Sequence, residues 1–576
     1  MTKNKLKVIL TNLFISSFFF ASCVNQDYDL SKNIDLNIHV GGSKLALPVG
    51  STDSIKLNKI IKVDESDVLH LNGGEYSLLK EDVVSPVKVS VNSVAPINVA
   101  PINLPIITIG HASAYSELHS ASGNLAVAVP LTSGVFELNR SGMPAELSSI
   151  KKIGISSAAQ VKAVMKFNLT GVNPSADVRF NNLVVTFPDF VVSNQLNANH
   201  ELILNDKVAG GLTKEIYING FSFSCESGGA LAIKNQLLQL EKNVSIAGNI
   251  VGTNLNASMV TGDIKLETSI TVSPVVISEV EGMVDPTINV KVNPISFSIP
   301  EFLKDEAVTM DVENPMIRLT VNNEIDIPII ISGVLRGYRN GVALSQVDIK
   351  GTSVNPIRID AAGKSVICLS RTGQGGPAGC KNYQIADLNK LIEKIPDKIG
   401  LVLNADADQS STHKIQLGKD YYVNIDYAVE VPFKFGSGLS IAYNDTIDGF
   451  NDDIKDLDIS SLNVTTTVEN NIPLKLQMEA IPVGIDKKTI SGLSVKVTGE
   501  IAPCDNNGKT QKSPITIELT EASDEAIKKL DGLLLKVTAK SPQTVNGMPL
   551  KESQYLRLTN IKAMAIGGLN LDLNKK

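Results

Sequence analysis

Long runs of alternating apolar and polar residues are the feature that most limits what this chain can fold into. Examples are Ala163–Leu169, Ile317–Val321 and Leu474–Met478, each with an apolar side chain at every second position. Successive side chains of a β-strand point to opposite faces, so this period of two predicts strands with one buried face. Such runs recur along the chain and are separated by Gly, Asn, Asp and Pro. The expected fold is all-β, with several antiparallel β-sandwich-like modules in tandem.

Two short helices are expected within this β-rich chain. The segment Ile385–Ile395 places four apolar side chains on one helical stripe, and Pro396 follows it and would end the helix. The segment Ser523–Asp531 begins with a helix-capping residue, has acids in its first turn and lysines in its last, and precedes Gly532. Both segments are expected to pack on sheets.

Composition bounds the class of protein. A chain of 576 residues is expected to form three or four domains, at about 150 residues per domain. Its 43% hydrophobic and 20% charged residues supply buried cores and exclude global disorder. A net charge of −7 does not favour binding to nucleic acid. With six His and no Trp, metal ligands, general bases and sugar-stacking rings are scarce, so the sequence predicts no cofactor, no metal and no enzymatic activity.

The N-terminus has the three parts of a secretory signal. Three lysines precede an apolar run over Val8–Phe20, and small residues lead to Cys23. The run is shorter than the roughly 20 residues of a membrane-spanning helix. Residues 1–22 are therefore expected to be a cleaved signal peptide, and their loss changes the net charge to −10 because three lysines leave.

The segment Phe20-Ala21-Ser22-Cys23 resembles a bacterial lipobox, although Phe20 replaces the usual Leu. In lipoproteins of this kind the thiol of the cysteine, here Cys23, takes a diacylglycerol. The acyl chains would anchor the protein in the membrane, because each buried CH₂ group adds about 0.8 kcal/mol of binding free energy. The alternative is an ordinary cleaved signal with Cys23 incidental.

Asp27 and Asp29 resemble the acidic export signal of surface lipoproteins of Bacteroidetes, or are acids of a solvated tether. Three segments are similar to large Bacteroidales lipoproteins of unassigned function: CVNQDYDLSKNID, LPVGSTDSIKLNKIIKVDESDVL and VENNIPLKLQMEAIPVG.

Four further cysteines form an even set, as expected of an exported protein. Cys368 and Cys380 flank the turn-rich segment LSRTGQGGPAG, so a disulfide between them is predicted. A disulfide that closes this short loop would stabilise the folded state by roughly 3 kcal/mol. Cys225 and Cys504 are far apart in sequence and are expected to be buried free thiols.

Internal similarities suggest repeated modules. The segment Val172–Arg179 returns as Val284–Lys291, an offset of 112, and the same offset relates Phe187–Phe190 to Ile299–Phe302. These are predicted to be two copies of one β module, or else two edge strands with similar turns. The segment TMDVENP at 309–315 also matches TTTVENN at 465–471, and this pattern before a strand is similar to the LEA14/WHy sandwich domains.

The expected organisation follows from these features. After the signal peptide (1–22) come a tether (23–44) and a small N-terminal unit with a proline-rich extended tail (45–110). The two repeat copies are expected at 111–255 and 256–350, and a C-terminal β unit with both short helices at 351–576.

Other site motifs are weak. Ser54 and Thr446 lie in D-[ST]-[apolar] patterns that resemble Bacteroidetes O-glycosylation sites, in turn-like contexts. An acidic stretch with Asp448 and three more aspartates lacks the glutamate of an EF-hand and is a loose calcium site or a solvated turn. His39, His70, His200 and His413 stand alone and are expected at the surface.

The favoured function is that of a lipid-anchored protein on the cell surface, used for binding, adhesion or assembly at the outer membrane. Its partners would be the outer membrane, through the N-terminal lipid, and another protein or a glycan. Two alternatives stay open. One is a periplasm-facing lipoprotein that binds lipid or another hydrophobic ligand, and the other is a glycan-active enzyme.

Overall fold

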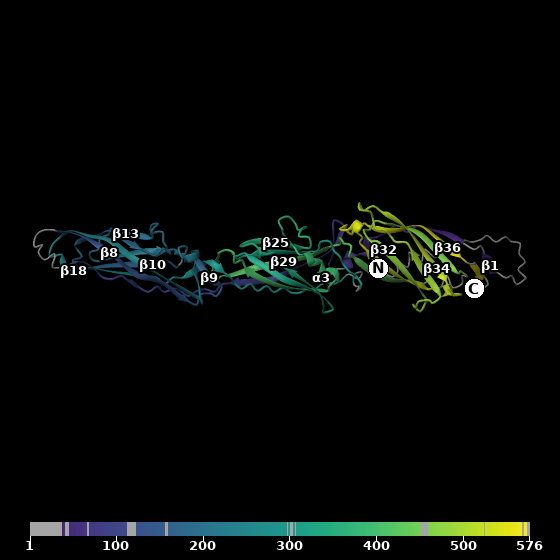
Figure 1. Ribbon diagram of the computed structural model, residues 1–576, viewed down its shortest axis with the longest axis horizontal. Helices are drawn as coiled ribbons and strands as arrows, with labels where there is room; N and C mark the ends of the chain where they lie inside the picture. The colour runs from purple at the N-terminus through teal and green to yellow at the C-terminus, as the bar shows by residue number, and fades with distance from the viewer. Residues whose placement is uncertain are drawn as a thin grey trace.

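The structure is a computed structural model that describes residues 37–40, 45–65, 68–111, 123–155, 159–296, 298–299, 303, 305, 307–449, 451, 459–523, 525–566 and 569–572. It confirms the all-β fold: separate sheets follow one another along an elongated molecule (Figure 1). Among the strand pairs of the described residues, only one is parallel. The sheets group into a distal, a middle and a terminal module, which are defined by their strands below.

The distal module contains three sheets, with strand orders β14-β10-β18-β6, β13-β11-β17-β8 and β12-β15-β9-β19-β28. Phe167 and Phe180 come from strands of the first two sheets and meet edge to face at 5.1 Å, so the core lies between these sheets. The strands are β6 (Ile102–Asn103), β7 (Ile107–Gly110), β8 (Gly123–Ser141), β9 (Leu147–Ile155), β10 (Val161–Val172), β11 (Asp177–Thr186), β12 (Val191–Val192), β13 (Glu201–Leu204), β14 (Leu212–Ile218), β15 (Gly220–Ser222), β16 (Leu231–Ala232), β17 (Leu237–Leu255), β18 (Val260–Val272) and β19 (Ile277–Val284).

The middle module is a pair of sheets with orders β26-β25-β21-β29-β5-β4 and β20-β27-β22-β23. Its elements are β4 (Leu69–Asn72), β5 (Glu75–Ser90), β20 (Ile295–Ser296), β21 (Met316–Asn323), β22 (Ile329–Arg339), β23 (Val342–Ile349), β24 (Ile357–Ile359), β25 (Gly363–Ser370), β26 (Lys381–Gln384), α3 (Lys390–Glu393), β27 (Lys398–Ala407), β28 (His413–Gln416) and β29 (Asp420–Pro432). Strand β28 leaves this module and joins the third distal sheet beside β19.

The terminal module has sheets ordered β2-β36-β31-β34-β33 and β30-β35-β32, together with the pair β1-β37. Its elements are β1 (Asn37–Val40), β2 (Leu45–Gly50), β3 (Ile55–Lys56), α2 (Leu57–Ile60), β30 (Ser440–Asp448), β31 (Ser461–Asn470), β32 (Lys475–Val483), β33 (Leu493–Thr498), β34 (Gln511–Glu521), β35 (Gly532–Lys540), β36 (Tyr555–Ile566) and β37 (Leu569–Asp572).

The chain runs out along the molecule once and then returns. Residues 45–110, which we call the outgoing segment, give β2 and β3 to the terminal module, β4 and β5 to the middle module, and β6 and β7 to the distal module. The strand pairing therefore does not follow the expected boundaries at 110, 255 and 350. Alternation within a strand specifies its buried face but not its partner, which can be hundreds of residues away.

The two repeat segments share a strand followed by a turn and then diverge. Val172 ends β10 and Val284 ends β19, in different sheets. After the first turn comes the ten-residue strand β11, whereas the described residues of the second copy make an isolated bridge between Ile288 and Ala405 and then the two-residue strand β20, which pairs with β27.

A different repeat recurs in all three modules. The side-chain oxygen of Asn173 accepts a hydrogen bond from the backbone N–H two residues on, and Asn323 and Asn470 do the same. Asn323 and Asn470 are buried, and each also donates to two backbone carbonyls. The similarity between segments 309–315 and 465–471 aligns Asn470 with Asn314 and not with Asn323. Asn314 makes different contacts, to Thr372 and Gln374.

The two expected helices are shorter than predicted. Within Ile385–Ile395, a 3₁₀ turn leads into the four-residue α3, and the four apolar side chains of the predicted stripe are buried. Among the described residues of Ser523–Asp531, the helical structure is a 3₁₀ turn over Ile527–Lys529, and strand β35 begins soon after it at Gly532.

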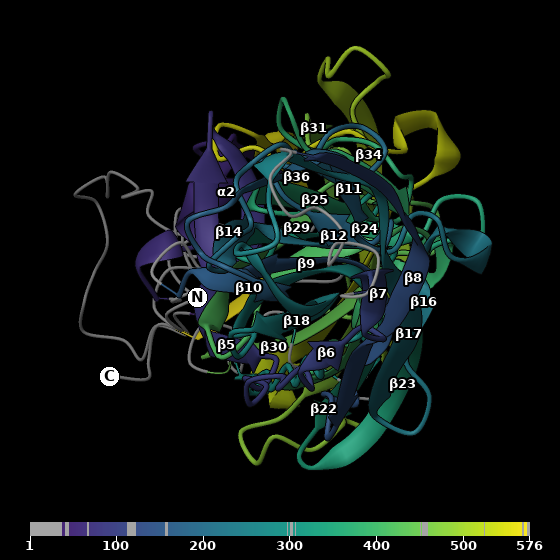
Figure 2. The ribbon, with the colours of Figure 1, turned by 90° about the vertical axis from the view of Figure 1, so that its left-hand side faces the viewer.

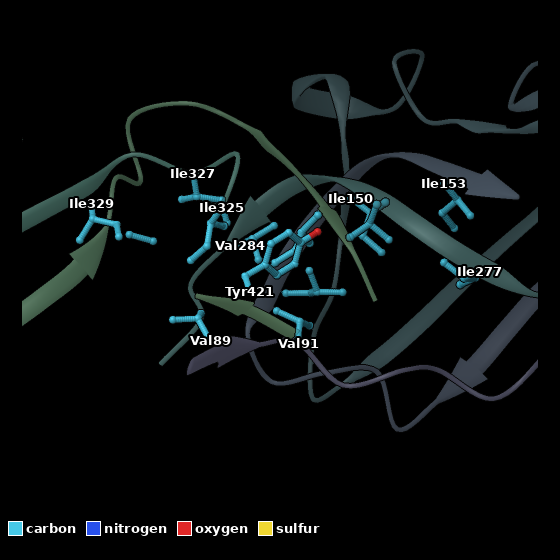
Figure 3. Close-up of a cluster of buried hydrophobic side chains, with 14 of the residues drawn as sticks. Val89, Val91, Ile150, Ile153, Ile277, Val284, Ile325, Ile327, Ile329 and Tyr421 are labelled. Carbon is cyan, nitrogen blue, oxygen red and sulfur yellow. The ribbon is translucent and has the colours of Figure 1, made fainter. Parts of the chain in front are cut away.

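The modules are joined by continuous packing. At the distal–middle junction, Val89 and Val91 of the outgoing segment lie with Ile150 and Val284 of the distal module and Tyr421 of the middle module in one buried cluster (Figure 3). Viewed from the distal end, the sheets of the modules overlap around one axis (Figure 2). Because large apolar junctions oppose domain motion, the molecule is expected to behave as a stiff rod.

The middle–terminal junction is built in the same way. The backbone N–H of Tyr76 donates to Leu550, and the N–H of Leu550 donates to Phe433. The rings of Tyr76 and Phe433 lie 6.4 Å apart, and Phe433 also contacts Phe435 at 5.6 Å. Burial raises the pKa of Tyr76 to about 12, so its hydroxyl stays protonated and donates to Ile61.

Candidate functional site

A well-organised exposed feature of the middle module is the loop between β25 and β26, residues 371–380, which we call the stapled loop. Cys368 near the end of β25 and Cys380 just before β26 form a disulfide, with their Cα atoms 6.2 Å apart. Strands β25 and β26 are parallel, so the chain must cross back over the sheet between them. The disulfide fixes both ends of that crossing, which contains no helix.

Side chains beside the loop hold its backbone in place. The side-chain oxygen of Asn314 accepts hydrogen bonds from the N–H and hydroxyl of Thr372, at 3.0 and 2.9 Å. The amide nitrogen of Asn314 donates to the carbonyl of Gln374 at 2.9 Å. The Ser370 hydroxyl donates to the same carbonyl and accepts from the Gln374 N–H. Asn314 of the VENP pattern therefore clamps the stapled loop.

An ion pair ties the loop to the segment before β21, and this segment in turn contacts the segment between β29 and β30 that enters the terminal module. Arg371 Nη1 donates to Asp311 Oδ1 at 2.8 Å and to the Val312 carbonyl at 2.6 Å. The other carboxylate oxygen of Asp311 accepts from the N–H of Gly438 at 2.9 Å. A Cβ at Gly436 would lie 2.3 Å from the same oxygen, so the close approach requires glycine there.

The chemistry of the stapled loop suits contact rather than catalysis. Its exposed residues carry no charge and little bulk, so a partner can approach the backbone closely; they are Thr372, Gln374, Gly375, Pro377, Ala378 and Gly379. Because the loop is already ordered, a partner would lose less entropy on binding to it than to a mobile loop. The sequence indicated the disulfide, but nothing in it indicated the Asn314 clamp.

A second polar cluster lies at the distal–middle junction. Arg358 pairs with the buried Asp408 at 2.5 Å, and the His413 ring contacts the Asp408 carbonyl at 2.5 Å. Hydrogen bonds from the Ser410 hydroxyl and backbone N–H, together with Arg358, hold the pKa of Asp408 below its usual value. His413 was expected at the surface and is buried instead, because β28 inserts into the distal sheet. Its ring meets a carbonyl and no carboxylate, so the cluster is not a catalytic triad.

Replacing Asp408 by asparagine is expected to lower the free energy of unfolding by about 2 kcal/mol at pH 7. The substitution removes the carboxylate charge that pairs with Arg358 and leaves a neutral amide in the same buried position. The folded-state pKa of Asp408 is depressed, so its contribution is present above the unfolded value and is lost as pH falls through the folded value. Urea unfolding of both proteins should therefore show a smaller difference at pH 3 than at pH 7. An equal difference at both pH values would contradict this assignment.

The structure describes some of the residues of the predicted lipidation, O-glycosylation and calcium sites and leaves others out. Cys23 lies outside the described residues. Of the two cysteines expected to be buried free thiols, Cys504 is buried, whereas Cys225 is exposed. Ser54 is half-buried just before β3, whereas Thr446 lies within the edge strand β30 and not in a turn. Asp448 pairs with Lys487, which also contacts Asp531, so Asp448 is already neutralised. The other aspartates of that stretch, 452, 453 and 456, lie outside the described residues.

An apolar cavity of about 40 Å³ lies in the middle module between its two sheets and α3. Pockets that hold ligands have roughly 300–1,000 Å³, so this cavity is far too small for an acyl chain. Within the described ranges, no helix is long and apolar enough to cross a membrane. The same residues contain no group of three or more His, Cys, Asp or Glu arranged to hold a metal ion.

Comparisons with known proteins give only distant similarities. No protein-family model matches the chain, and no curated protein matches it at a significant level. A “putative secreted protein” from Parabacteroides distasonis ATCC 8503 is 16% identical with a TM-score of 0.35, over 50% of this chain and 83% of that chain. A structure of the infectious bursal disease virus Gx strain is 6% identical with a TM-score of 0.13, over 87% of this chain and 81% of that one. Similarities this weak transfer neither a fold nor an activity.

Proposed function

We propose that the protein is a lipid-anchored rod on the outer face of the outer membrane, which holds a binding surface away from the membrane. The observation that carries this proposal is the pairing of β1 with β37 at one end of the rod, opposite the distal module (Figure 1). A lipid on Cys23, 14 residues before β1 begins at Asn37, would attach that end to the membrane. The distal module would then point outward.

The stiffness expected of the rod supports a role in display. Buried apolar packing continues through both module junctions, so the distance between the anchor and the distal module would be maintained. The stapled loop, on the middle module, is the surface we propose for contact with a protein or a glycan. The alternative of a lipid carrier gains no support from the 40 Å³ cavity.

The anchor is tested by replacing Cys23 with alanine in a Bacteroidetes host. We expect the wild-type protein to sediment with membranes and to be degraded when protease is added to intact cells. Cys23→Ala should lose membrane association, whereas Cys225→Ala, which removes an exposed thiol of the distal module, should behave as wild type. Firm membrane attachment of Cys23→Ala would refute the anchor, and protection of the wild type from protease would favour a periplasmic location.

The contact surface is tested by placing the same long charged side chain at two exposed positions. Ala378→Arg alters the stapled loop, and Ala343→Arg alters the exposed edge strand β23 of the same module. Binding to arrayed glycans and to immobilised surface proteins would be measured for both variants. Loss of binding in Ala378→Arg alone would support the loop as the contact, whereas equal binding by both variants would exclude it.

A further inference from the structure

The outgoing segment gives the rod an unusual path for mechanical force. Between residues 45 and 110 the chain passes once from the terminal to the distal module and pairs with strands of the returning chain on the way. We propose that this segment carries tension between the membrane anchor and the distal module, and that its strand geometry makes the rod resist pulling in that direction. The proposal rests on the anchored function above, because the lipid is what would transmit force to the N-terminus.

The direction of the N-terminal strands determines how they would be loaded. In β1, Asn37 pairs with Asp572 and Val40 with Leu569, and in β2, Leu45 pairs with Ala565 and Pro48 with Lys562. The chain therefore enters at the outer end of the terminal module and runs inward, antiparallel to β37 and β36. A pull on the N-terminus away from the rod acts along these strands, so the hydrogen bonds between them share the load as in shear.

The middle module repeats this arrangement over a longer distance. Strand β5 pairs with β29 from Ser77 opposite Pro432 to Ser90 opposite Asp420. Sliding β5 out would also remove its buried side chains from the core, among them Tyr76, Val87 and Val89. The segment then bridges Ile97 to Val275 in the distal module. Extension between the anchor and the distal module thus requires several strand pairs to slide together.

The two chain ends offer the opposite geometry. Leu45 and Ala565 face each other at the same end of the rod, and so do Asn37 and Asp572. Pulling the N-terminus and the C-terminus apart would peel β1 and β2 away from β37 and β36, so that one pair of hydrogen bonds breaks at a time. The same protein should consequently be strong in one pulling direction and weak in the other.

Single-molecule force spectroscopy on the full mature chain with Cys23→Ser tests this directly. For the shear direction, handles would be attached to the N-terminus and to Ser175→Cys, in the exposed turn between β10 and β11 of the distal module, with Cys225→Ser removing the competing thiol. For the peeling direction, handles would be attached to the N-terminus and the C-terminus. We expect the first unfolding force to be several-fold higher in the shear direction, and equal or reversed forces would overturn the proposal.

A matched pair of variants on β5 identifies the segment involved. Val87 is 5% exposed and points into the core, whereas Val83 on the same strand is 66% exposed. Val87→Ala should lower the force in the shear direction and leave the first peeling event unchanged, and Val83→Ala should change neither. An unchanged shear force in Val87→Ala would exclude β5 from the force path. Because these measurements use the isolated protein, loss of the anchor assignment in cells would leave their outcome untouched, so the two proposals fail separately.

Discussion

Replacing Asn470 by alanine is expected to destabilise the terminal module by about 4 kcal/mol. The Asn470 amide group donates to the carbonyls of Leu474 and Ala502, at 3.0 and 2.8 Å, and its oxygen accepts from the N–H of Ile472 at 2.8 Å. The side chain is fully buried. Removing it would leave these three backbone groups without a partner in a region that water does not reach, at about 1–3 kcal/mol for each unsatisfied group before relaxation.

The matched control is Asn173→Ala in the distal module. Asn173 forms the same turn, accepting from the N–H of Ser175 at 3.0 Å, but it is exposed and water can replace the lost bond. Its substitution is expected to cost less than about 1 kcal/mol. A multi-module chain need not unfold in one step, so hydrogen exchange of β31 peptides and urea unfolding by circular dichroism would be measured together. Equal losses in the two variants would show that burial of Asn470 contributes nothing.

Replacing Phe190 by alanine is expected to destabilise the distal module by about 3–5 kcal/mol. The Phe190 ring is buried at the centre of an aromatic cluster, 5.5 Å from Phe136, 5.9 Å from Phe221 and 6.1 Å from Phe223. Truncation would remove all three ring contacts and leave a cavity that strands from two sheets cannot close without shifting.

Two further substitutions separate ring contacts from general burial. Phe190→Leu retains an apolar side chain and is expected to cost about 1.5 kcal/mol or less. Val192→Ala, two residues along at a partly exposed site, is expected to cost less than about 1 kcal/mol. Thermal unfolding by circular dichroism gives the comparison. A Phe190→Ala variant as stable as Val192→Ala would show that the cluster does not contribute to the stability of the distal module.

Local features of the fold could be predicted from the sequence because they depend on neighbouring residues. The alternation at Ala163–Leu169 became part of β10, and that at Ile317–Val321 became part of β21. The apolar stripe at Ile385–Ile395 became the buried side of a short helical turn. In each case the period of the pattern predicts which side chains share one face and become buried on folding.

Features of the candidate site that depend on distant residues were missed. The sequence match placed Asn314 with Asn470, but Asn314 clamps the stapled loop, whereas Asn470 closes a buried turn as Asn323 does. Short patterns of this kind do not encode which carbonyls will lie within reach of an amide. Likewise, His413 carried no sign of its burial, because that depends on β28 joining a sheet of another module.

The sequence by itself determined the strand-rich class, strands at Ala163–Leu169 and Ile317–Val321, and the turn-rich loop between Cys368 and Cys380. Only the tertiary structure decided that residues 45–110 are shared among three modules and that β2 pairs with β36, about 500 residues away. The physical reason is that side-chain periodicity is a property of a single strand. Sheet order, by contrast, depends on which backbone edges and apolar faces meet once the whole chain is compact.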